Sequence, residues 1–185
     1  MNGDEGVAEQ WTPAIAVDAA GNAHAVWQDN RNGDYDIYAS DRPAGGSWGP
    51  DVRVNDDTGE ADQVTVAIGL RGNTIMAVWQ DERNGESDIY ASYRLAGGTW
   101  SANERVNDSS VNSRTYPAID LDPTGAAYVV WSDERNGDPD VYFSHRPGPH
   151  AVFLPIVLGT SPRTLTRRPK LPTISTRTTT TTSAR

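Results

Sequence analysis

The sequence of 185 residues has no cysteine, only three histidines and a single lysine, Lys170. Without cysteine there are no disulfides and no thiolate metal sites, although this absence does not fix the compartment. The histidines are too few for a histidine-rich metal site. No apolar run approaches the ~20 residues that a transmembrane helix needs. The first residues do not have the pattern of a signal peptide.

Positively charged residues are also scarce over most of the chain. Residues 1–158 contain all 25 acidic residues and only ten arginines, so this part carries a formal charge of −15. Residues 159–185 contain five arginines and Lys170, which gives +6. A strongly acidic body would repel phosphates and argues against nucleic acid as a partner.

One stretch is present three times. The sequence VWQDNRNGDYDIYAS at 26–40 returns in closely similar form at 78–92 and 130–144, with a spacing of 52 residues. A fixed period of this kind indicates one structural unit copied in tandem. The first ten residues match 54–63, so we expect the chain to begin inside a repeat. The expected division is a remnant of a preceding repeat at 1–10, repeats at 11–56, 57–108 and 109–158, the last of which ends in an apolar strand, and a disordered tail at 159–185.

Each repeat divides into short strand candidates joined by turns, with an Asn-Gly hairpin signal between the second and third strands. The second strands IMAVW (75–79) and AYVVW (127–131) are continuously apolar, which predicts a sheet covered on both faces. No helix candidate exists to cover them, so other sheets must. The sequence therefore predicts an all-β fold, an incomplete β-propeller of about three four-stranded antiparallel blades. A β-sandwich is the alternative, but it would not repeat at a constant 52 residues.

The segments that follow the repeated stretch are GGSW (45–48) or GGTW (97–100) and then RVND (53–56, 105–108). Together these motifs resemble bacterial sialidase-like propellers with BNR or Asp-box repeats. The end of the Asp-box pattern is matched by Gly45, Ser47 and Trp48 and by Gly97, Thr99 and Trp100. Its aspartate position holds Pro43 and Leu95 instead, and no counterpart of the family's arginine motif is found. The resemblance implies a propeller outside the cell or at its surface.

The candidate site is the repeated loop D-x-R-N-G-x-x-D. As a ligand-binding rim for a sugar, a peptide or Ca²⁺, it would use Asp29, Arg31, Asp36, Asp81, Arg83, Asp88, Asp133, Arg135 and Asp140. The structural interpretation is that these side chains hold the turn and the blade together. The repetition of the loop favours the structural interpretation, since a catalytic site is normally present only once in a protein. The residues expected to be structural in each repeat are Trp27, Trp79, Trp131, Trp48, Trp100, Asn32, Gly33, Asn84, Gly85, Asn136 and Gly137.

The sequence thus predicts a non-catalytic repeat module that binds carbohydrate or protein or serves as a surface scaffold. It assigns no catalytic residue and no cofactor, with Ca²⁺ as the one candidate ion. Open blade edges predict self-association. The alternative is a fragment of a sialidase-like glycoside hydrolase whose catalytic residues lie in missing blades. We expect this chain alone not to hydrolyse sialosides.

Overall fold

The computed structural model describes residues 6–108, 112–148 and 153–156, and the predicted tail at 159–185 lies outside them. Within these residues the chain forms twelve strands and no helix. Blade 1 contains β1 (Gln10–Val17), β2 (Ala23–Asp29), β3 (Asp36–Arg42) and β4 (Val52–Arg53). Blade 2 contains β5 (Gln63–Arg71), β6 (Thr74–Asp81), β7 (Asp88–Leu95) and β8 (Glu104–Arg105). Blade 3 contains β9 (Arg114–Leu121), β10 (Ala127–Asp133), β11 (Asp140–Arg146) and β12 (Leu154–Ile156).

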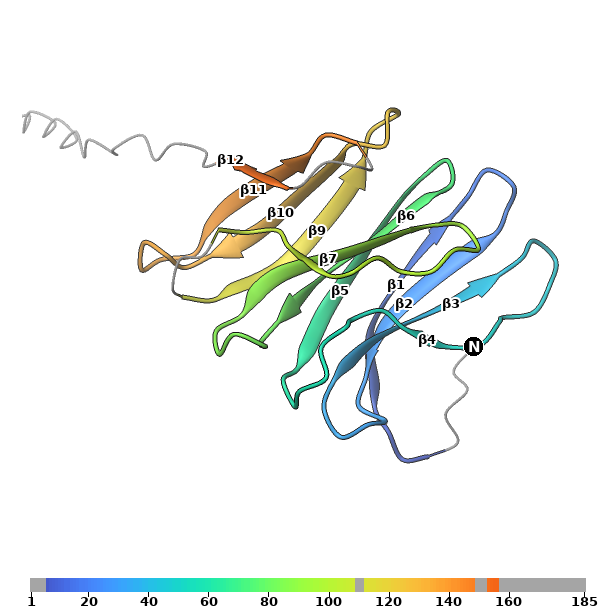
Figure 1. The fold of residues 1–185 in the computed structure, drawn as a ribbon, viewed down its shortest axis with the longest axis horizontal. Helices are drawn as coiled ribbons and strands as arrows, with labels where there is room; N and C mark the ends of the chain where they lie inside the picture. Colours follow the sequence, from blue (N-terminus) through green and yellow to red (C-terminus); the bar gives the residue numbers. More distant parts are fainter. Residues whose placement is uncertain (1–5, 109–111, 149–152, 157–185) are drawn as a thin grey trace, which may run out of the picture.

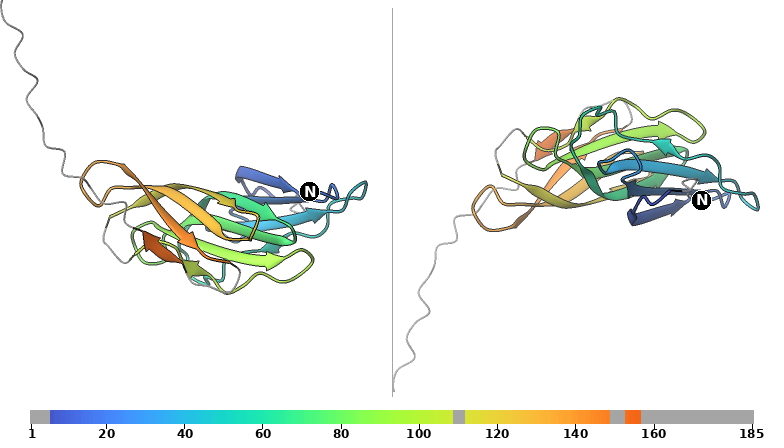
Figure 2. Two further views of the ribbon diagram at one scale, coloured as in Figure 1. Left: turned by 90° about the horizontal axis from the view of Figure 1, so that it is seen from above. Right: turned by 90° about the horizontal axis from the view of Figure 1, so that it is seen from below.

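The strands of each blade follow one another in chain order, and all neighbours are antiparallel. Figures 1 and 2 show the three sheets side by side in one row, from blade 1 to blade 3. The first strands β1, β5 and β9 pack beside one another, and the fourth strands lie at the opposite edge of each sheet. The predicted fold class, an all-β incomplete propeller of four-stranded antiparallel blades, is therefore confirmed. No helix that could cross a membrane is found in the described part of the chain.

Each blade has two chemically distinct faces, because side chains alternate along a strand. We call one the tryptophan face, which carries Ala25, Trp27 and Tyr38 in blade 1 and their equivalents in the other blades. The opposite side, the valine face, carries Val26, Ile37 and Ala39 in blade 1 and their equivalents in the other blades. One core cluster joins the valine face of blade 1 to the tryptophan face of blade 2. A second cluster repeats this packing between blades 2 and 3.

The prediction that both second-strand runs are covered on both faces holds for only one of them. Residues 75–79 in blade 2 are all buried. In blade 3, however, Tyr128 and Val130 are exposed. These two side chains lie on the valine face, against which no fourth blade packs among the described residues. The apolar run predicts what the strand is able to bury, whereas burial itself depends on a neighbouring sheet.

The sequence places the first strands at 14–18, 64–70 and 118–122, whereas β1 and β9 begin four residues earlier, at Gln10 and Arg114, and β5 begins at Gln63. Each contains a β-bulge at which the register with the second strand shifts. A residue with positive φ lies in each bulge: Thr12 (47°), Thr65 (54°) and Tyr116 (55°). Non-glycine residues rarely adopt this conformation, and two of the three strands also contain a proline beside it. The alternation is broken there, which is why periodicity alone places the strand starts too late.

The outer edge of blade 3 is built differently from those of blades 1 and 2. The third repeat has no RVND segment, and β12 takes the outer position by pairing with β11. Pro155 lies in this strand opposite Ser144. An edge strand tolerates proline because its outer side needs no hydrogen-bond donor.

Replacement of Gly69 tests the close packing of the first strands. A Cβ atom at Gly69 would lie 2.4 Å from Leu121 Cδ1 and 3.2 Å from Ile119 Cγ1, both in the next blade. Gly69→Val should therefore lower the free energy of unfolding by about 1–3 kcal/mol through overpacking. Urea denaturation measures this. Gly59→Val is the control, since an added Cβ there meets only Asp57 at 3.5 Å. Equal effects of the two variants would contradict the blade packing described.

Candidate functional site

The repeated loop joins the second and third strands of each blade, and its first aspartate is fully buried in all three copies. In blade 3, Asp133 accepts hydrogen bonds from Trp131 Nε1 at 3.2 Å and from the Arg135 backbone N–H at 3.0 Å. The Arg135 guanidinium donates two more, at 2.9 and 2.5 Å. Asp29 and Asp81 are held by the equivalent tryptophan and arginine in their own blades. These aspartates thus organise the interior of the loop, and ligand binding by them stays a prediction.

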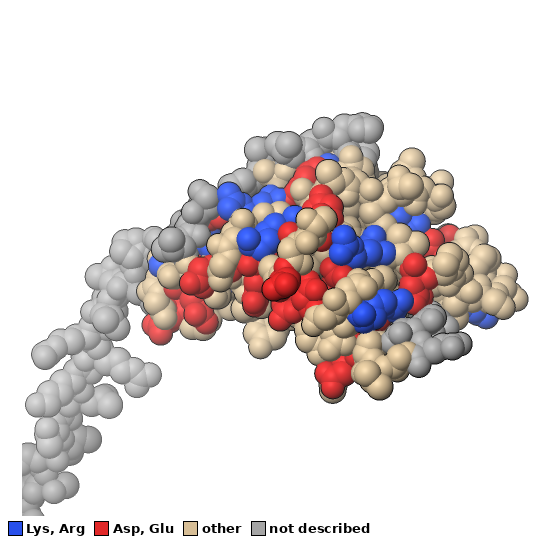
Figure 3. All heavy atoms as spheres, turned by 60° about the horizontal axis from the view of Figure 1, so that its bottom comes forward, with Lys and Arg blue, Asp and Glu red and all other residues tan. Residues whose placement is uncertain are grey.

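The loop arginines connect neighbouring blades. The Arg135 guanidinium lies 4.2 Å from the centre of the Tyr142 ring and donates to Asp108, at 2.7 Å, in the connection from blade 2. Arg83 makes the same contact with Asp56, at 2.8 Å, in the connection from blade 1. Figure 3 shows the result on one face of the molecule, where acidic and basic side chains lie beside one another. In blade 1 the equivalent arginine binds Asp51 within its own blade, at 3.1 Å.

The second aspartate of the loop differs between blades. In blade 2, Asp88 accepts hydrogen bonds from Asn84 Nδ2 at 3.0 Å and Asn107 Nδ2 at 2.8 Å. Asp36 in blade 1 is held by the equivalent asparagines. Asp140 in blade 3 is exposed, because the third repeat lacks the RVND segment that supplies the second asparagine. The Asn-Gly turns themselves have the positive φ at glycine that this hairpin requires, at Gly33, Gly85 and Gly137.

The electrostatics of the loop argue against a role for its first aspartate as a general acid. Burial by itself would raise the pKa of Asp133, but the hydrogen bonds from Arg135 and Trp131 outweigh it and lower the pKa to about 2. The pKa of Asp29 is lowered for the same reasons. A general acid needs the opposite shift. No group of three or more histidines, aspartates or glutamates suited to a metal ion is found in the described residues. Ca²⁺ binding by this loop stays a prediction.

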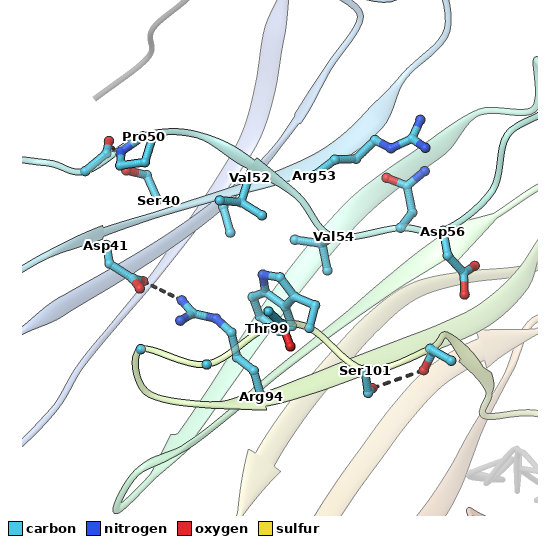
Figure 4. A pocket seen from close by; sticks show the side chains of 17 residues that line it. Ser40, Asp41, Pro50, Val52, Arg53, Val54, Asp56, Arg94, Thr99 and Ser101 are labelled. Atoms are coloured by element: carbon cyan, nitrogen blue, oxygen red, sulfur yellow. Dashed lines mark hydrogen bonds and ion pairs between the residues drawn. The ribbon is translucent and has the colours of Figure 1, made fainter.

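A groove of about 690 Å³ lies between blades 1 and 2, a feature that the sequence did not reveal. The β3–β4 segment of blade 1 and the β7–β8 segment of blade 2 line it. Figure 4 shows Val52 and Val54 pointing into it from one side. Trp100 contributes an aromatic ring from the other side, and Thr99 lies exposed beside this ring. The walls therefore combine apolar surface with a few polar groups.

One end of the groove is closed by an ion pair between blades. Arg94 of blade 2 lies 4.8 Å from the Trp100 ring and donates to Asp41 of blade 1 at 2.5 Å. Burial by itself would raise the pKa of Asp41, but the hydrogen bonds from Arg94 and His24 have the larger effect. The pKa of Asp41 is therefore lowered. His24 is buried with its Nδ1 2.8 Å from the same carboxylate. At the second interface Tyr93 occupies the position of Asp41, and the equivalent Arg146 pairs instead with Glu104 at 3.1 Å.

A second cluster that the sequence did not reveal lies where the first strands begin. Tyr35 donates its hydroxyl to Glu9 Oε2 at 3.0 Å and its backbone N–H to Asp62 Oδ1 at 2.9 Å. The hydrogen bond to Glu9 raises the pKa of Tyr35. Glu9 and Asp62 each precede the first strand of a blade, whereas blade 3 has Ser113 there. Tyr35 and Glu9 lie 26 positions apart in the sequence, and no local pattern links them.

Comparison with known proteins supports the fold. No protein-family model and no curated protein matches the sequence. The chain is similar to a thermostable family-43 glycoside hydrolase, with 11% identity, a TM-score of 0.59 and coverage of 86% of this chain and 61% of that chain. It is also similar to an α-L-arabinanase from Penicillium chrysogenum complexed with arabinobiose, with 13% identity and a TM-score of 0.50. That match covers 80% of this chain and 48% of that one.

These neighbours are β-propeller glycoside hydrolases. The chain spans less than two thirds of the length of either, and at such identities the likeness establishes the fold alone. The resemblance to sialidase-like propellers is therefore supported at the level of a propeller, and not for BNR or Asp-box repeats in particular.

The low pKa of Asp133 predicts a specific loss of stability in acid. The folded-state pKa of about 2 lies below the ordinary value of 3.8. The resulting stabilisation is complete above pH 4 and disappears as the pH falls through 2. Asp133→Asn should remove about 1–2 kcal/mol of this pH dependence, measured by urea denaturation between pH 5 and 2. The control is Asp138→Asn, an exposed carboxylate in the same loop. An unchanged pH profile in Asp133→Asn would show that this carboxylate is not held as described.

Proposed function

We propose that this chain is part of a carbohydrate-active β-propeller of the glycoside hydrolase type. The observation that carries the proposal is the likeness to a family-43 glycoside hydrolase across 86% of the chain. This likeness favours the glycoside hydrolase alternative over the non-catalytic module that the repeats suggested first. Because the chain covers only 61% of that neighbour, the activity of the whole assembly is part of the proposal.

Within such a protein, the described blades would contribute sugar binding at the groove between blades 1 and 2. Carbohydrate sites pair an aromatic face with polar groups that recognise hydroxyls. Trp100 offers the aromatic ring, and Val52 and Val54 extend the apolar wall. Thr99 and Ser101 supply hydroxyls on the blade 2 side. The groove volume of about 690 Å³ suits an oligosaccharide of a few residues.

Cleavage by these blades is the second candidate function, and one observation favours it. Glycoside hydrolysis needs two carboxyl groups that flank the scissile bond. The repeated aspartates are held by arginines, tryptophans and asparagines in at least two of the three copies, so they are poor candidates. Glu9 and Asp62 are different, because they lie at the starts of first strands and share Tyr35 as a hydrogen-bond donor. Neither carboxylate is paired with an arginine in the described part of the chain, and this is what favours them.

Sugar binding is tested by filling the groove. Thr99→Tyr would place a second ring beside Trp100 and should weaken the binding of arabinobiose at least tenfold, or about 1.4 kcal/mol. Isothermal titration calorimetry measures this, with sialyllactose as a second probe. Thr124→Tyr, an exposed threonine in the turn between β9 and β10, is the matched control and should bind like the parent. If the parent bound neither sugar at millimolar concentration, or if both variants bound equally well, the groove would not be the site.

Hydrolysis is tested separately. The purified chain should release no aglycone above background from a fluorogenic α-arabinofuranoside or sialoside, because five of its six repeated carboxylates are held in ion pairs. Turnover in the parent that disappears in Glu9→Gln or Asp62→Asn, with folding retained by circular dichroism, would reverse this expectation. It would make the carboxylates beside Tyr35 the catalytic pair. Glu60→Gln, an exposed carboxylate in the same connection as Asp62, is the control.

A further inference from the structure

The two interfaces between blades surround an equivalent arginine with different side chains. Arg94 of β7 and Arg146 of β11 are 52 positions apart, and each crosses to the preceding blade. At the second interface the Arg146 guanidinium lies 4.3 Å from the centre of the Tyr93 ring and 5.8 Å from the centre of the Phe153 ring. Two aromatic rings therefore accompany the guanidinium there.

At the first interface, the described residues supply only one of these two rings. Arg94 lies 4.8 Å from the centre of the Trp100 ring, which corresponds to the ring of Phe153. At the position of Tyr93, however, blade 1 has Asp41, which has no ring. The groove of about 690 Å³ lies at this place, with Asp41 and Arg94 in its wall. The groove is thus found where the second interface places an aromatic side chain.

The wall of the groove around Arg94 suits an aromatic ring. Val52 and Val54 point into the groove in Figure 4. Val52 occupies the position of Glu104, the residue that pairs with Arg146 at the second interface. Apolar side chains beside a guanidinium favour the face of an aromatic ring, because the ring buries apolar surface and its quadrupole attracts the cation.

Arg94 and Asp41 both keep capacity for a ligand. The Arg94 side chain is 6% exposed, and its Nε–H is buried without a hydrogen-bond partner among the described residues. Its Nη2 donates to Asp41 Oδ1 at 2.5 Å, and the same oxygen lies 2.8 Å from His24 Nδ1. The Asp41 side chain is still 37% exposed. An ionised carboxylate has further lone pairs, so Asp41 can accept another hydrogen bond from a ligand.

We propose that the groove binds a phenolic ring carried by its carbohydrate ligand, in the place that Tyr93 occupies at the second interface. In this arrangement the ring packs against Arg94 and the two valines, and its hydroxyl donates to Asp41. A phenol satisfies both groups, because its face attracts the guanidinium and its O–H needs an acceptor. The inference rests on the proposed function for the sugar, whereas the second interface supplies the model for the ring.

Three probes separate the ring from the sugar. The parent chain should bind 4-hydroxyphenyl α-L-arabinofuranoside about tenfold more tightly than methyl α-L-arabinofuranoside in calorimetry, because only the first carries the ring. The third probe, p-cresol, should bind alone and displace the aryl glycoside. Equal affinity for the two glycosides, or no binding of p-cresol, would overturn the inference without touching the sugar site. Binding of p-cresol but of neither the methyl glycoside nor arabinobiose would support the ring site and reject the proposed sugar.

The second interface also provides the variants. His24→Met together with Asp41→Tyr gives blade 1 the residues that blade 2 has at these positions, Met76 and Tyr93. This double variant should fold, as measured by circular dichroism, and lose p-cresol binding because its own ring fills the groove. Leu95→Tyr is the control, since Leu95 is 61% exposed and does not line the groove, and it should bind p-cresol like the parent. A folded double variant that bound p-cresol as the parent does would overturn the proposal.

The reciprocal change tests the same model even if the double variant does not fold. Tyr93→Asp removes the ring beside Arg146 and gives blade 2 the carboxylate of blade 1. Equilibrium dialysis should then find two p-cresol molecules bound per chain in place of one, because both interfaces now have an arginine, an acid and an unfilled ring position. If the number stayed at one, the space left by Tyr93 would not bind a phenol, and the model for the first interface would be wrong.

Discussion

The buried carboxylate at the end of each second strand is the interaction on which the rest of this structure depends. An ionised aspartate in the interior is costly unless it is paired and fully hydrogen-bonded. Here the indole of the strand tryptophan, a backbone N–H and a guanidinium supply those bonds. The same guanidinium stacks on the tyrosine of the third strand and, in blades 2 and 3, reaches the preceding connection. One charge therefore orients the core, the turn and the junction between blades.

The fold was predictable because these constraints recur with every copy. A period of 52 residues, an Asn-Gly turn and apolar second strands leave few architectures other than stacked four-stranded sheets. The repeat period could not predict that equivalent residues of the inner and terminal blades differ in burial. Val78 and Val130 are the same residue at the same register, yet one is fully buried and the other is 41% exposed. Local sequence specifies the strand, but only the neighbouring sheet determines its burial.

The candidate groove and the cluster around Tyr35 were less predictable than the fold, because their residues come from different blades. The charged groups of the repeated loop are hydrogen-bonded within the loop and to the neighbouring connection, and whether the loop also binds a ligand stays a prediction. The groove between blades 1 and 2 depends instead on Asp41 and Arg94, which are 53 positions apart. The cluster around Tyr35 likewise joins Glu9 and Asp62 from two different blades. Such pairs come together only when blades pack, so no spacing within a single repeat reveals them.

In a tandem protein, a function that needs one site must therefore be sought where equivalent positions differ. The buried aspartates are alike in all copies and serve every blade equally. By contrast, Asp41, Tyr93 and His145 are different residue types at one equivalent position, and each contacts a different partner: Arg94, Arg146 and Tyr128, respectively. Asp41 closes the groove, Tyr93 supports the Arg146 guanidinium, and His145 lies on the exposed valine face of blade 3. Divergence at this position therefore gives a different contact to each of three otherwise repeated blades.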